Sequence, residues 1–340
     1  MCGLGALTYS PPINAHTQPS VAVIGCGQRG LRHVDTLRRF ARGQVVRSLL
    51  VCDMNPEALS RAQAISGAKG TRDWERAVED PAVDALVIAT PAACHAPMVL
   101  AALDRGKHVF CEAPLALDVR TAATMAQAAS MGSMVVGACG LEMFFHLQPL
   151  ATLARQGVLG DLRWGHAYAQ QDEFAKAADP QTARGQIVAA TFKGLLPHMM
   201  ILGGASPDRV STLGMVSAGI PGLPDKFSAE ISLASGLTLM LQCGGHLPTE
   251  LFPVLRGTRA SLELRSHRSL LHHNDGHIER LYLGSPALVP GADPTTHTLA
   301  AWLTLVDRPA LREPCCKALF AAQLIACQTV ESFQANALLI

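Results

Sequence analysis

The sequence predicts an α/β protein with two domains: an N-terminal doubly wound parallel sheet and a C-terminal α+β domain with an open, mostly antiparallel sheet. Up to about residue 140, short apolar runs alternate with segments of helical period, which is typical of right-handed βαβ units. Farther along, Phe227, Ala229, Ile231 and Leu233 alternate with polar residues, which predicts strands with one buried face. A length of 340 residues favours two domains over one core.

We divide the chain where its patterning changes. Residues 1–19 contain Gly, Pro, Asn and Ser but no basic n-region and no long apolar core, and they are predicted to form a flexible tail rather than a signal peptide. Residues 20–140 form the parallel-sheet domain, and residues 141–312 form the second domain, which we expect to hold the substrate and the oligomer contacts. Residues 313–340 are predicted to be a C-terminal helix that packs back on both domains.

A glycine-rich turn follows the first predicted strand, Val21 to Ile24. Gly25, Gly27 and Gly30 give the spacing G-x-G-x-x-G, and a helix is predicted to begin near Gln28. The first glycine allows a tight turn, the second lets a pyrophosphate approach the backbone, and the third lets the helix pack closely on the strand. The pattern predicts a dinucleotide site whose pyrophosphate lies on the first amides of that helix.

An acidic residue follows the second predicted strand, Val45 to Cys52. Asp53 lies a little over twenty residues after Gly30, where a carboxylate can accept hydrogen bonds from the adenosine ribose. Because a carboxylate repels a 2′-phosphate, Asp53 favours NAD over NADP. Arg29 could reach a phosphate, so NADP stays possible.

The remaining elements are predicted from period and capping residues. Asn55-Pro56-Glu57 is predicted to start a helix with proline in its first turn, and Asp73 and Asp118 are placed to cap helices. The other expected strands and helices are Ala85–Ala89, His108–Cys111, Met134–Val136, Leu147–Gln156, Leu162–Ala169, Arg209–Val216, Leu237–Cys243, Ser261–Leu264, His277–Leu283 and Cys315–Phe333.

Composition excludes several classes of protein. The net charge of +1 lacks the basic excess of a nucleic-acid binder, and no apolar run reaches the length of a membrane span. Ten cysteines without a C-x-x-C pair predict a reduced, cytoplasmic setting. His272 to His277 contains metal-ligand residue types, but Asn274-Asp275-Gly276 is what a tight hairpin requires, so we expect a turn and no metal.

Several stretches, taken in order, resemble the Gfo/Idh/MocA oxidoreductases, the glucose–fructose oxidoreductase and inositol dehydrogenase group. Jointly they cover most of residues 20 to 333. The stretches that carry the resemblance are residues 23–30, 83–91, His95, residues 102–117, Gly157 to Gly160, and Gly203-Gly204 with Pro207. The resemblance implies a Rossmann domain, a nicotinamide cofactor and hydride transfer in a cleft between the two domains.

This chain departs from the family pattern where chemistry is expected. The family usually has Glu-Lys-Pro after the fourth strand of the parallel sheet, and its lysine is taken to hydrogen-bond the reacting hydroxyl; here the residues are Glu112-Ala113-Pro114. The family also places an aspartate four residues before a histidine. Here the histidine is His198, position 194 is Gly194, and Lys193 precedes it.

The resemblance and the residues together nominate a candidate site. The catalytic candidates are His198, expected to project from a helix start toward the cofactor, and Lys193, which could fill the space left by Ala113. A histidine satisfied by backbone and a solvated lysine are the alternatives. The predicted cofactor-binding residues are Gly25, Gly27, Gln28, Arg29, Gly30, Asp53, Thr90, Pro91, His95, Glu112 and Ala113.

Three functions remain open on the sequence alone. The first is an NAD(P)-dependent oxidoreductase acting on a sugar-like or other small polar hydroxyl or carbonyl compound, with non-standard acid–base residues. The second is a redox-neutral NAD-binding lyase, cyclase or hydrolase, and the third is a catalytically silent dinucleotide sensor. We expect a small-molecule substrate, no nucleic-acid or membrane partner, and a homodimer or homotetramer formed through the second-domain sheet.

Overall fold

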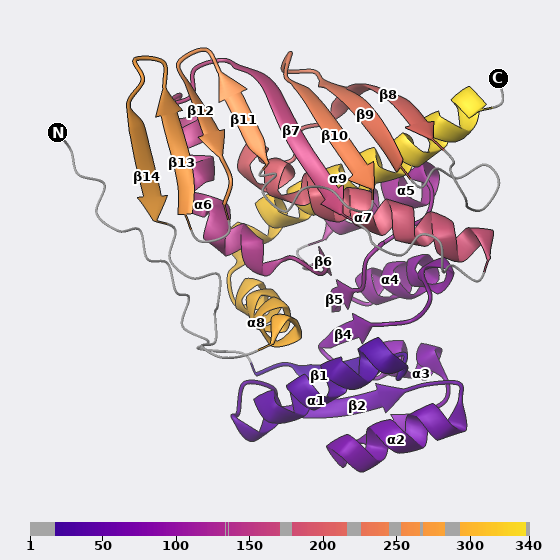
Figure 1. Cartoon of the computed structure of the whole chain (residues 1–340). Coiled ribbons are helices and arrows are strands. Elements are labelled where there is room, and N and C mark those ends of the chain that lie inside the picture. Colours follow the sequence, from indigo (N-terminus) through magenta and orange to yellow (C-terminus); the bar gives the residue numbers. More distant parts are fainter. Residues whose placement is uncertain are drawn as a thin grey trace.

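The computed structural model describes residues 18–132, 134, 136–170, 179–215, 226–244, 253–265, 268–282 and 293–337. Two sheets organise it: a six-stranded parallel sheet and an eight-stranded sheet (Figure 1). This arrangement confirms the predicted fold class. Nearly all of the tail predicted over residues 1–19 lies outside the described residues.

The parallel sheet has the strand order β3-β2-β1-β4-β5-β6. Its central strands are completely buried because helices cover both faces, so they lack a period of two. The strand order reverses between β1 and β4, and the carboxyl ends of strands at such a point form the crevice where ligands bind. The strands are β1 (Ser20–Ile24), β2 (Ser48–Cys52), β3 (Lys69–Thr71), β4 (Ala85–Ile88), β5 (His108–Cys111) and β6 (Val136–Gly137).

Helices with the expected caps connect these strands. The side chains of Asn55, Asp73 and Asp118 each accept backbone N–H at a helix start, which confirms the predicted caps Asp73 and Asp118 and the helix start predicted at Asn55. A short 3₁₀ turn, Ala92–Cys94, precedes α4. The helices are α1 (Gln28–Arg42), α2 (Pro56–Ser66), α3 (Trp74–Glu79), α4 (His95–Asp104) and α5 (Val119–Met131).

The second sheet has the order β14-β13-β12-β11-β7-β10-β9-β8. All its neighbouring strands are antiparallel except β7 and β10, which run parallel. In β9 buried and more exposed residues alternate, as predicted for a sheet with one covered face. The strands are β7 (Leu162–Gln170), β8 (Pro207–Met215), β9 (Lys226–Leu233), β10 (Thr238–Gly244), β11 (Val254–Gly257), β12 (Ala260–Glu263), β13 (Arg268–His273) and β14 (Ile278–Tyr282).

Four further helices link the two sheets. Helix α7 lies between the eight-stranded sheet and the end of the parallel sheet, and α9 runs along α7, α5 and β8 (Figure 1). The final helix therefore contacts elements of both domains. These helices are α6 (Glu142–Arg155), α7 (Pro180–Leu202), α8 (Pro294–Val306) and α9 (Pro309–Ala337).

None of the helices within the described ranges is long and apolar enough to cross a membrane.

Candidate active site

The glycine turn after β1 is shaped by two close backbone approaches. Gly25 has φ +90°, and a Cβ there would lie 2.7 Å from the carbonyl oxygen of Ala89. A Cβ on Gly30 would lie 1.8 Å from the carbonyl oxygen of Gly25. Gly27 differs because a Cβ built on it would meet open space. The first and third glycines are thus required by packing, and the second leaves a path to the backbone.

The start of α1 faces this path. Gly27 is the N-cap, no side chain in the described part of the chain caps the helix, and its first turn contains no acidic residue. Gln28 and Arg29 are exposed there. First-turn amides without a capping side chain, together with the helix dipole, suit an anion. The pyrophosphate of a dinucleotide therefore fits this turn.

Asp53 is fixed at the end of β2 by the backbone around it. Its Oδ2 accepts the N–H of Cys26 at 2.6 Å, and its Oδ1 accepts the N–H of Asn55 at 2.8 Å. These bonds tie the carboxylate to the glycine turn, one strand away from Gly25. The side chain is half-buried, so it also has an exposed part with which to bind ribose hydroxyls.

Thr90 and Pro91 follow β4, at the same end of the sheet. His95, predicted as a cofactor-binding residue, is only 1 % exposed in this structure. Its Nε2 lies 2.8 Å from the carbonyl oxygen of Thr90, and its Nδ1 lies 2.9 Å from that of Pro114. Burial lowers the pKa of His95, although both carbonyls and Glu112 oppose the shift. His95 therefore bridges the loops after β4 and β5.

Glu112, at the end of β5, is paired with a residue that the sequence analysis missed. His33 of α1 lies 2.6 Å from it, measured from Nε2 to Oε1, and the two side chains are 3 % and 15 % exposed. Burial opposes ionisation of Glu112, but the His33 contact and the charges of Arg29 and Lys193 lower its pKa overall. His33 could have been found from helical spacing, because it follows Gly30 by three residues on the face that meets the sheet.

The loop after Glu112 is held from the second domain and from α9. The Ala113–Pro114 peptide bond is cis. Gln323 of α9, which is fully buried, accepts the N–H of Leu115 at 3.0 Å and donates to the carbonyl of Ala116 at 2.9 Å. Arg184 of α7 donates to the carbonyl of Leu117 at 2.8 Å. The backbone at Ala113 therefore has a fixed position.

Lys193 lies on the part of α7 that packs on β7, next to Gly194. It is exposed, and its charge acts on both Glu112 and Cys139. Burial raises the pKa of the Cys139 thiol to about 11. One turn farther along α7, Leu196 would touch a Cβ on Gly140 at 3.1 Å. This turn of α7 thus lies beside the loop that follows β6.

His198 does not occupy the predicted place. It lies in the last turns of α7 rather than at a helix start, and it is fully buried. Its Nε2 lies 3.3 Å from the carbonyl oxygen of Val254 on β11, so the ring faces the second sheet. Burial lowers its pKa to about 4 despite contacts with backbone carbonyls. The alternative interpretation, a histidine satisfied by backbone, holds for Nε2 only, because Nδ1 is buried and has no hydrogen-bond partner among the described residues.

The histidine-rich stretch in the second domain forms the predicted hairpin. Gly276 has φ +88° between β13 and β14, and Asp275 accepts the N–H of His277 at 2.9 Å. Among the residues that the structure describes, no group of three His, Cys, Asp or Glu side chains is arranged to hold a metal ion.

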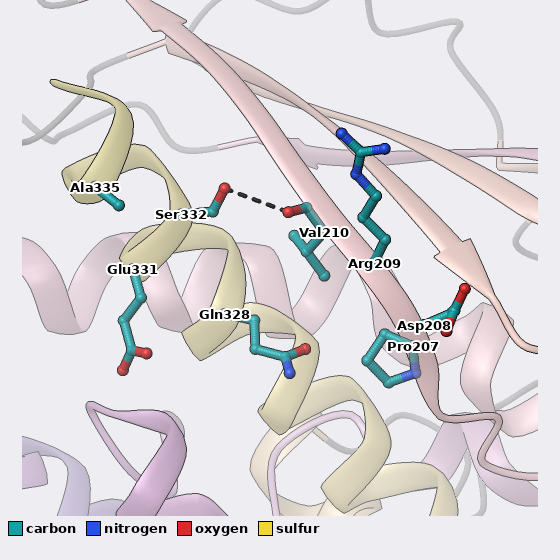
Figure 2. A pocket seen from close by; sticks show the side chains of 8 residues that line it. All are labelled: Pro207, Asp208, Arg209, Val210, Gln328, Glu331, Ser332 and Ala335. Atoms are coloured by element: carbon teal, nitrogen blue, oxygen red, sulfur yellow. Dashed lines mark hydrogen bonds between the residues drawn. The ribbon is translucent and has the colours of Figure 1, made fainter. Parts of the chain in front are cut away.

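Two cavities lie along α9, away from the nucleotide-binding edge. A groove of about 350 Å³ runs between β8 and α9, with Ser332 donating to the carbonyl of Val210 at 3.4 Å across it (Figure 2). In this view Arg209 and Glu331 point away from each other. A second cavity of about 500 Å³ lies between α5 and α9. Neither cavity is lined by a predicted site residue.

Comparison with known proteins agrees with this geometry. Residues 20–138 match the family model described as "Oxidoreductase family, NAD-binding Rossmann fold", of the GFO_IDH_MocA group. The dinucleotide-binding domain belongs to the Gfo/Idh/MocA family. The matched segment contains the glycine turn, Asp53, Thr90 and Glu112.

The chain is similar to an inositol 2-dehydrogenase of Rhodococcus jostii, 34% identical over 43% of this chain and 40% of that protein. A glycosyl hydrolase family 109 protein of Shewanella amazonensis is 32% identical over 43% of this chain and 34% of that protein. The chain thus matches less than half the length of either relative. A levoglucosan dehydrogenase in complex with NADH and levoglucosan has the same fold over 93% of this chain and 98% of its own, with TM-score 0.70 and 17% identity.

The structure gives a physical reason for one departure from the family pattern. A Cβ on Gly194 would lie 2.6 Å from the carbonyl oxygen of Tyr168, because α7 packs directly on β7 there. An aspartate, the usual residue at this position in the resemblance, would clash with the strand backbone. The neighbouring Lys193 points instead into solvent.

Proposed function

We propose that this protein is an NAD(P)-dependent oxidoreductase that acts on a small polar hydroxyl or carbonyl compound, such as a sugar or polyol, with Lys193 as its acid–base group. The proposal is supported by the family match and by relatives whose names include inositol dehydrogenases. The observation that favours Lys193 over His198 is exposure: Lys193 is exposed on α7, whereas His198 is fully buried and faces the second sheet.

Alcohol oxidation and carbonyl reduction both need a group that moves a proton at the substrate oxygen. When bound, the nicotinamide supplies the hydride acceptor or donor. Ala113 has no proton to exchange, and buried His198 faces the second sheet. Lys193 can hydrogen-bond the substrate oxygen, accept its proton during oxidation and return it during reduction. A positioned acid–base group contributes about a hundred- to ten-thousand-fold to such a step.

The other residues at the carboxyl end of the parallel sheet bind and orient the cofactor. The amides at the start of α1 hold the pyrophosphate, and the Asp53 carboxylate holds the ribose and disfavours a 2′-phosphate. His95 and Gln323 fix the loops after β4 and β5, which form the base of the nicotinamide pocket in this proposal.

The test is Lys193→Met, assayed by NADH absorbance with a panel of polyols and keto-sugars. We expect kcat to fall about a hundredfold or more, while the dissociation constant for NAD in a calorimetric titration stays unchanged. Lys317→Met is the matched control, because Lys317 pairs with Glu313 on α9 at 2.6 Å, outside the site. Full turnover by Lys193→Met would refute the acid–base role. No NADH change with any substrate would refute dehydrogenase activity.

A redox-neutral hydrolase is the second candidate, favoured by the relative named as a glycosyl hydrolase family 109 protein and by the missing loop lysine. It is distinguished by incubating the protein and NAD with chromogenic glycosides. Release of the aglycone with no net NADH would favour this candidate. NADH formation in proportion to product would favour the dehydrogenase.

A further inference from the structure

The end of β3 places an arginine beside the residue predicted to bind the adenosine ribose. Strands β2 and β3 are parallel neighbours, and where they end the N–H of Asp53 donates to the carbonyl of Thr71 at 3.2 Å. Arg72 follows Thr71 directly, and its Nε donates to the carbonyl of Met54 at 3.1 Å. The guanidinium of Arg72 is therefore bound to the residue that follows Asp53, at the carboxyl end of the sheet.

The turn that contains Arg72 is fixed by its neighbours. The Oγ1 of Thr71 accepts the N–H of Asp73 at 3.2 Å. The Asp73 carboxylate accepts the N–H groups of Glu75 and Arg76 at the start of α3, and it lies 3.5 Å from the Arg76 guanidinium. This carboxylate therefore interacts with α3 and not with Arg72.

The guanidinium of Arg72 has unused donors, because it carries terminal NH₂ groups besides Nε. Within the described ranges its side chain makes the hydrogen bond to Met54 and no ion pair. The side chain of Arg72 is exposed, and that of Met54 beside it is 76 % exposed. A guanidinium with unused, exposed donors suits a phosphate group, whose oxygens accept paired N–H groups.

We propose that Arg72 is a specificity-determining residue for the cofactor: its guanidinium binds the 2′-phosphate of NADP, so the protein accepts NADP as well as NAD although Asp53 repels that phosphate. The inference rests on the dinucleotide binding in the proposed function and not on the role of Lys193. Arg29 has a different place, because it lies in the first turn of α1, and the pyrophosphate expected there is common to both cofactors.

A solvated surface arginine is the alternative, since arginine is mostly an exposed residue and the bond to Met54 then serves only the turn. In that case neutralising Arg72 changes the affinity for neither cofactor. If Arg72 binds the 2′-phosphate, only the cofactor that carries this group loses affinity. The two roles are therefore separated by a ratio of dissociation constants.

Calorimetric titrations of the full chain with NAD and with NADP measure this ratio without a substrate. In Arg72→Met we expect the dissociation constant for NADP to rise about tenfold or more, and that for NAD to change less than about twofold. Arg72→Lys keeps the positive charge and should recover part of the NADP affinity.

Two further arginines give matched controls. Arg29→Met should weaken NAD and NADP alike, because both have the pyrophosphate. Arg105→Met should weaken neither, because Arg105 is an exposed residue that precedes β5 and so lies at the opposite end of the sheet.

The outcomes separate this inference from the proposed function. Wild-type protein that binds NAD but not NADP would overturn the inference, and so would an unchanged ratio of the two dissociation constants in Arg72→Met; either result leaves the proposed dehydrogenase standing. A ratio that changes in Arg29→Met instead would assign the 2′-phosphate to Arg29 and overturn the inference. Wild-type protein that binds neither cofactor would refute both proposals.

Discussion

Gly27 and Gly30 are three residues apart in the sequence and differ in the space that a side chain would have. Gly30 has no room for a Cβ because the carbonyl of Gly25 lies against it, whereas Gly27 has open space around it and φ −70°. One glycine is therefore needed by the fold itself, and the other is needed only when a ligand arrives.

These two glycines give a paired prediction. Gly30→Ala should lower the free energy of unfolding by about 3 kcal/mol or more, because a backbone clash cannot be relieved by a rotamer change. Gly27→Ala should cost at most about 1 kcal/mol but weaken NAD binding tenfold or more, because the methyl group occupies the approach of the pyrophosphate. Thermal unfolding and calorimetric titration measure the two effects. A Gly27→Ala variant that binds NAD normally would contradict this account.

Asp53 combines a structural and a recognition role. Asp53→Ser should shift the preference between NADP and NAD about tenfold toward NADP, because the charge that repels a 2′-phosphate is gone. The variant should also lose roughly 1–3 kcal/mol of stability, since the N–H groups of Cys26 and Asn55 lose their acceptor. Asp35→Ser on the outer side of α1 is the control for an exposed carboxylate. If the ratio of the dissociation constants for NADP and NAD did not change, Asp53 would not be the residue that distinguishes the two cofactors.

The residues that sequence reasoning placed well are those with a local signature. The glycine spacing, Asp53 and the helix caps depend on neighbours within a few positions, so one sequence predicts them. Gln323 acts on a partner far along the chain, and nothing near it in the sequence indicates a role. The spacing of His33 from Gly30 indicates the face of α1 on which it lies, but not that Glu112 is its partner. The orientation of His198 was predicted wrongly because the motif around a histidine does not determine which neighbour its face of the helix meets.

At the scale of elements, α1 and α8 are joined through the cap of α8. Asp293 accepts the N–H groups of Thr295 and Thr296, and it lies 3.3 Å from Arg39 of α1. Partial burial opposes ionisation of Asp293, but the bonds from Thr296, Arg39 and Thr295 outweigh it and lower its pKa to about 2. The stabilisation from this charge is present above pH 4 and is lost as pH falls from 4 toward 2.

Two substitutions separate the cap from the charge. Asp293→Ala should cost about 1 kcal/mol, because the helix start loses its acceptor. Asp293→Asn keeps the cap and removes only the charge, so it should cost less, since Asp293 and Arg39 are both exposed enough to be screened. The difference in Tm between wild type and Asp293→Asn should shrink as pH falls through 4. A difference that persists at pH 2 would show that the charge is not its source.

Element boundaries were predicted best where one face of an element meets solvent. The alternation in β9 predicted its hairpin with β10, and the polar turn at Asn274 to Gly276 predicted the next hairpin. Helix α7 was missed over most of its length because apolar side chains are buried on all its sides, so no period of 3.6 stands out. Helix α8 was missed for the same reason, and α9 continues through Pro314, which we expected to precede it.

At the scale of the whole molecule, the outer face of the second sheet is the surface that we expect to pair with another copy. Helices α7 and α9 lie on one side of this sheet (Figure 1). On the other side, Trp164, His166 and Tyr168 of β7 form an aromatic row, with the last two rings stacked at 4.4 Å. Met240 of β10 lies beside His166 in the register of the sheet.

Light scattering tests this expectation. The wild-type protein should have the mass of a dimer or tetramer, and Met240→Glu should shift it toward the monomer, because a charge would be buried at the centre of the interface. Ile65→Glu replaces an exposed apolar residue on α2 and should leave the mass unchanged. A monomeric wild-type protein would contradict the expected assembly.

The two hydrogen bonds of Gln323 to the loop at Leu115 and Ala116 affect the order in which the protein can fold during its synthesis. The nucleotide-binding half leaves the ribosome first, yet the loop at the end of β5 gains its partner only when the last helix has been translated. We therefore expect that a nascent or prematurely terminated chain can form the parallel sheet but not a competent pocket. Incomplete products would then be unable to compete with the finished enzyme for substrate.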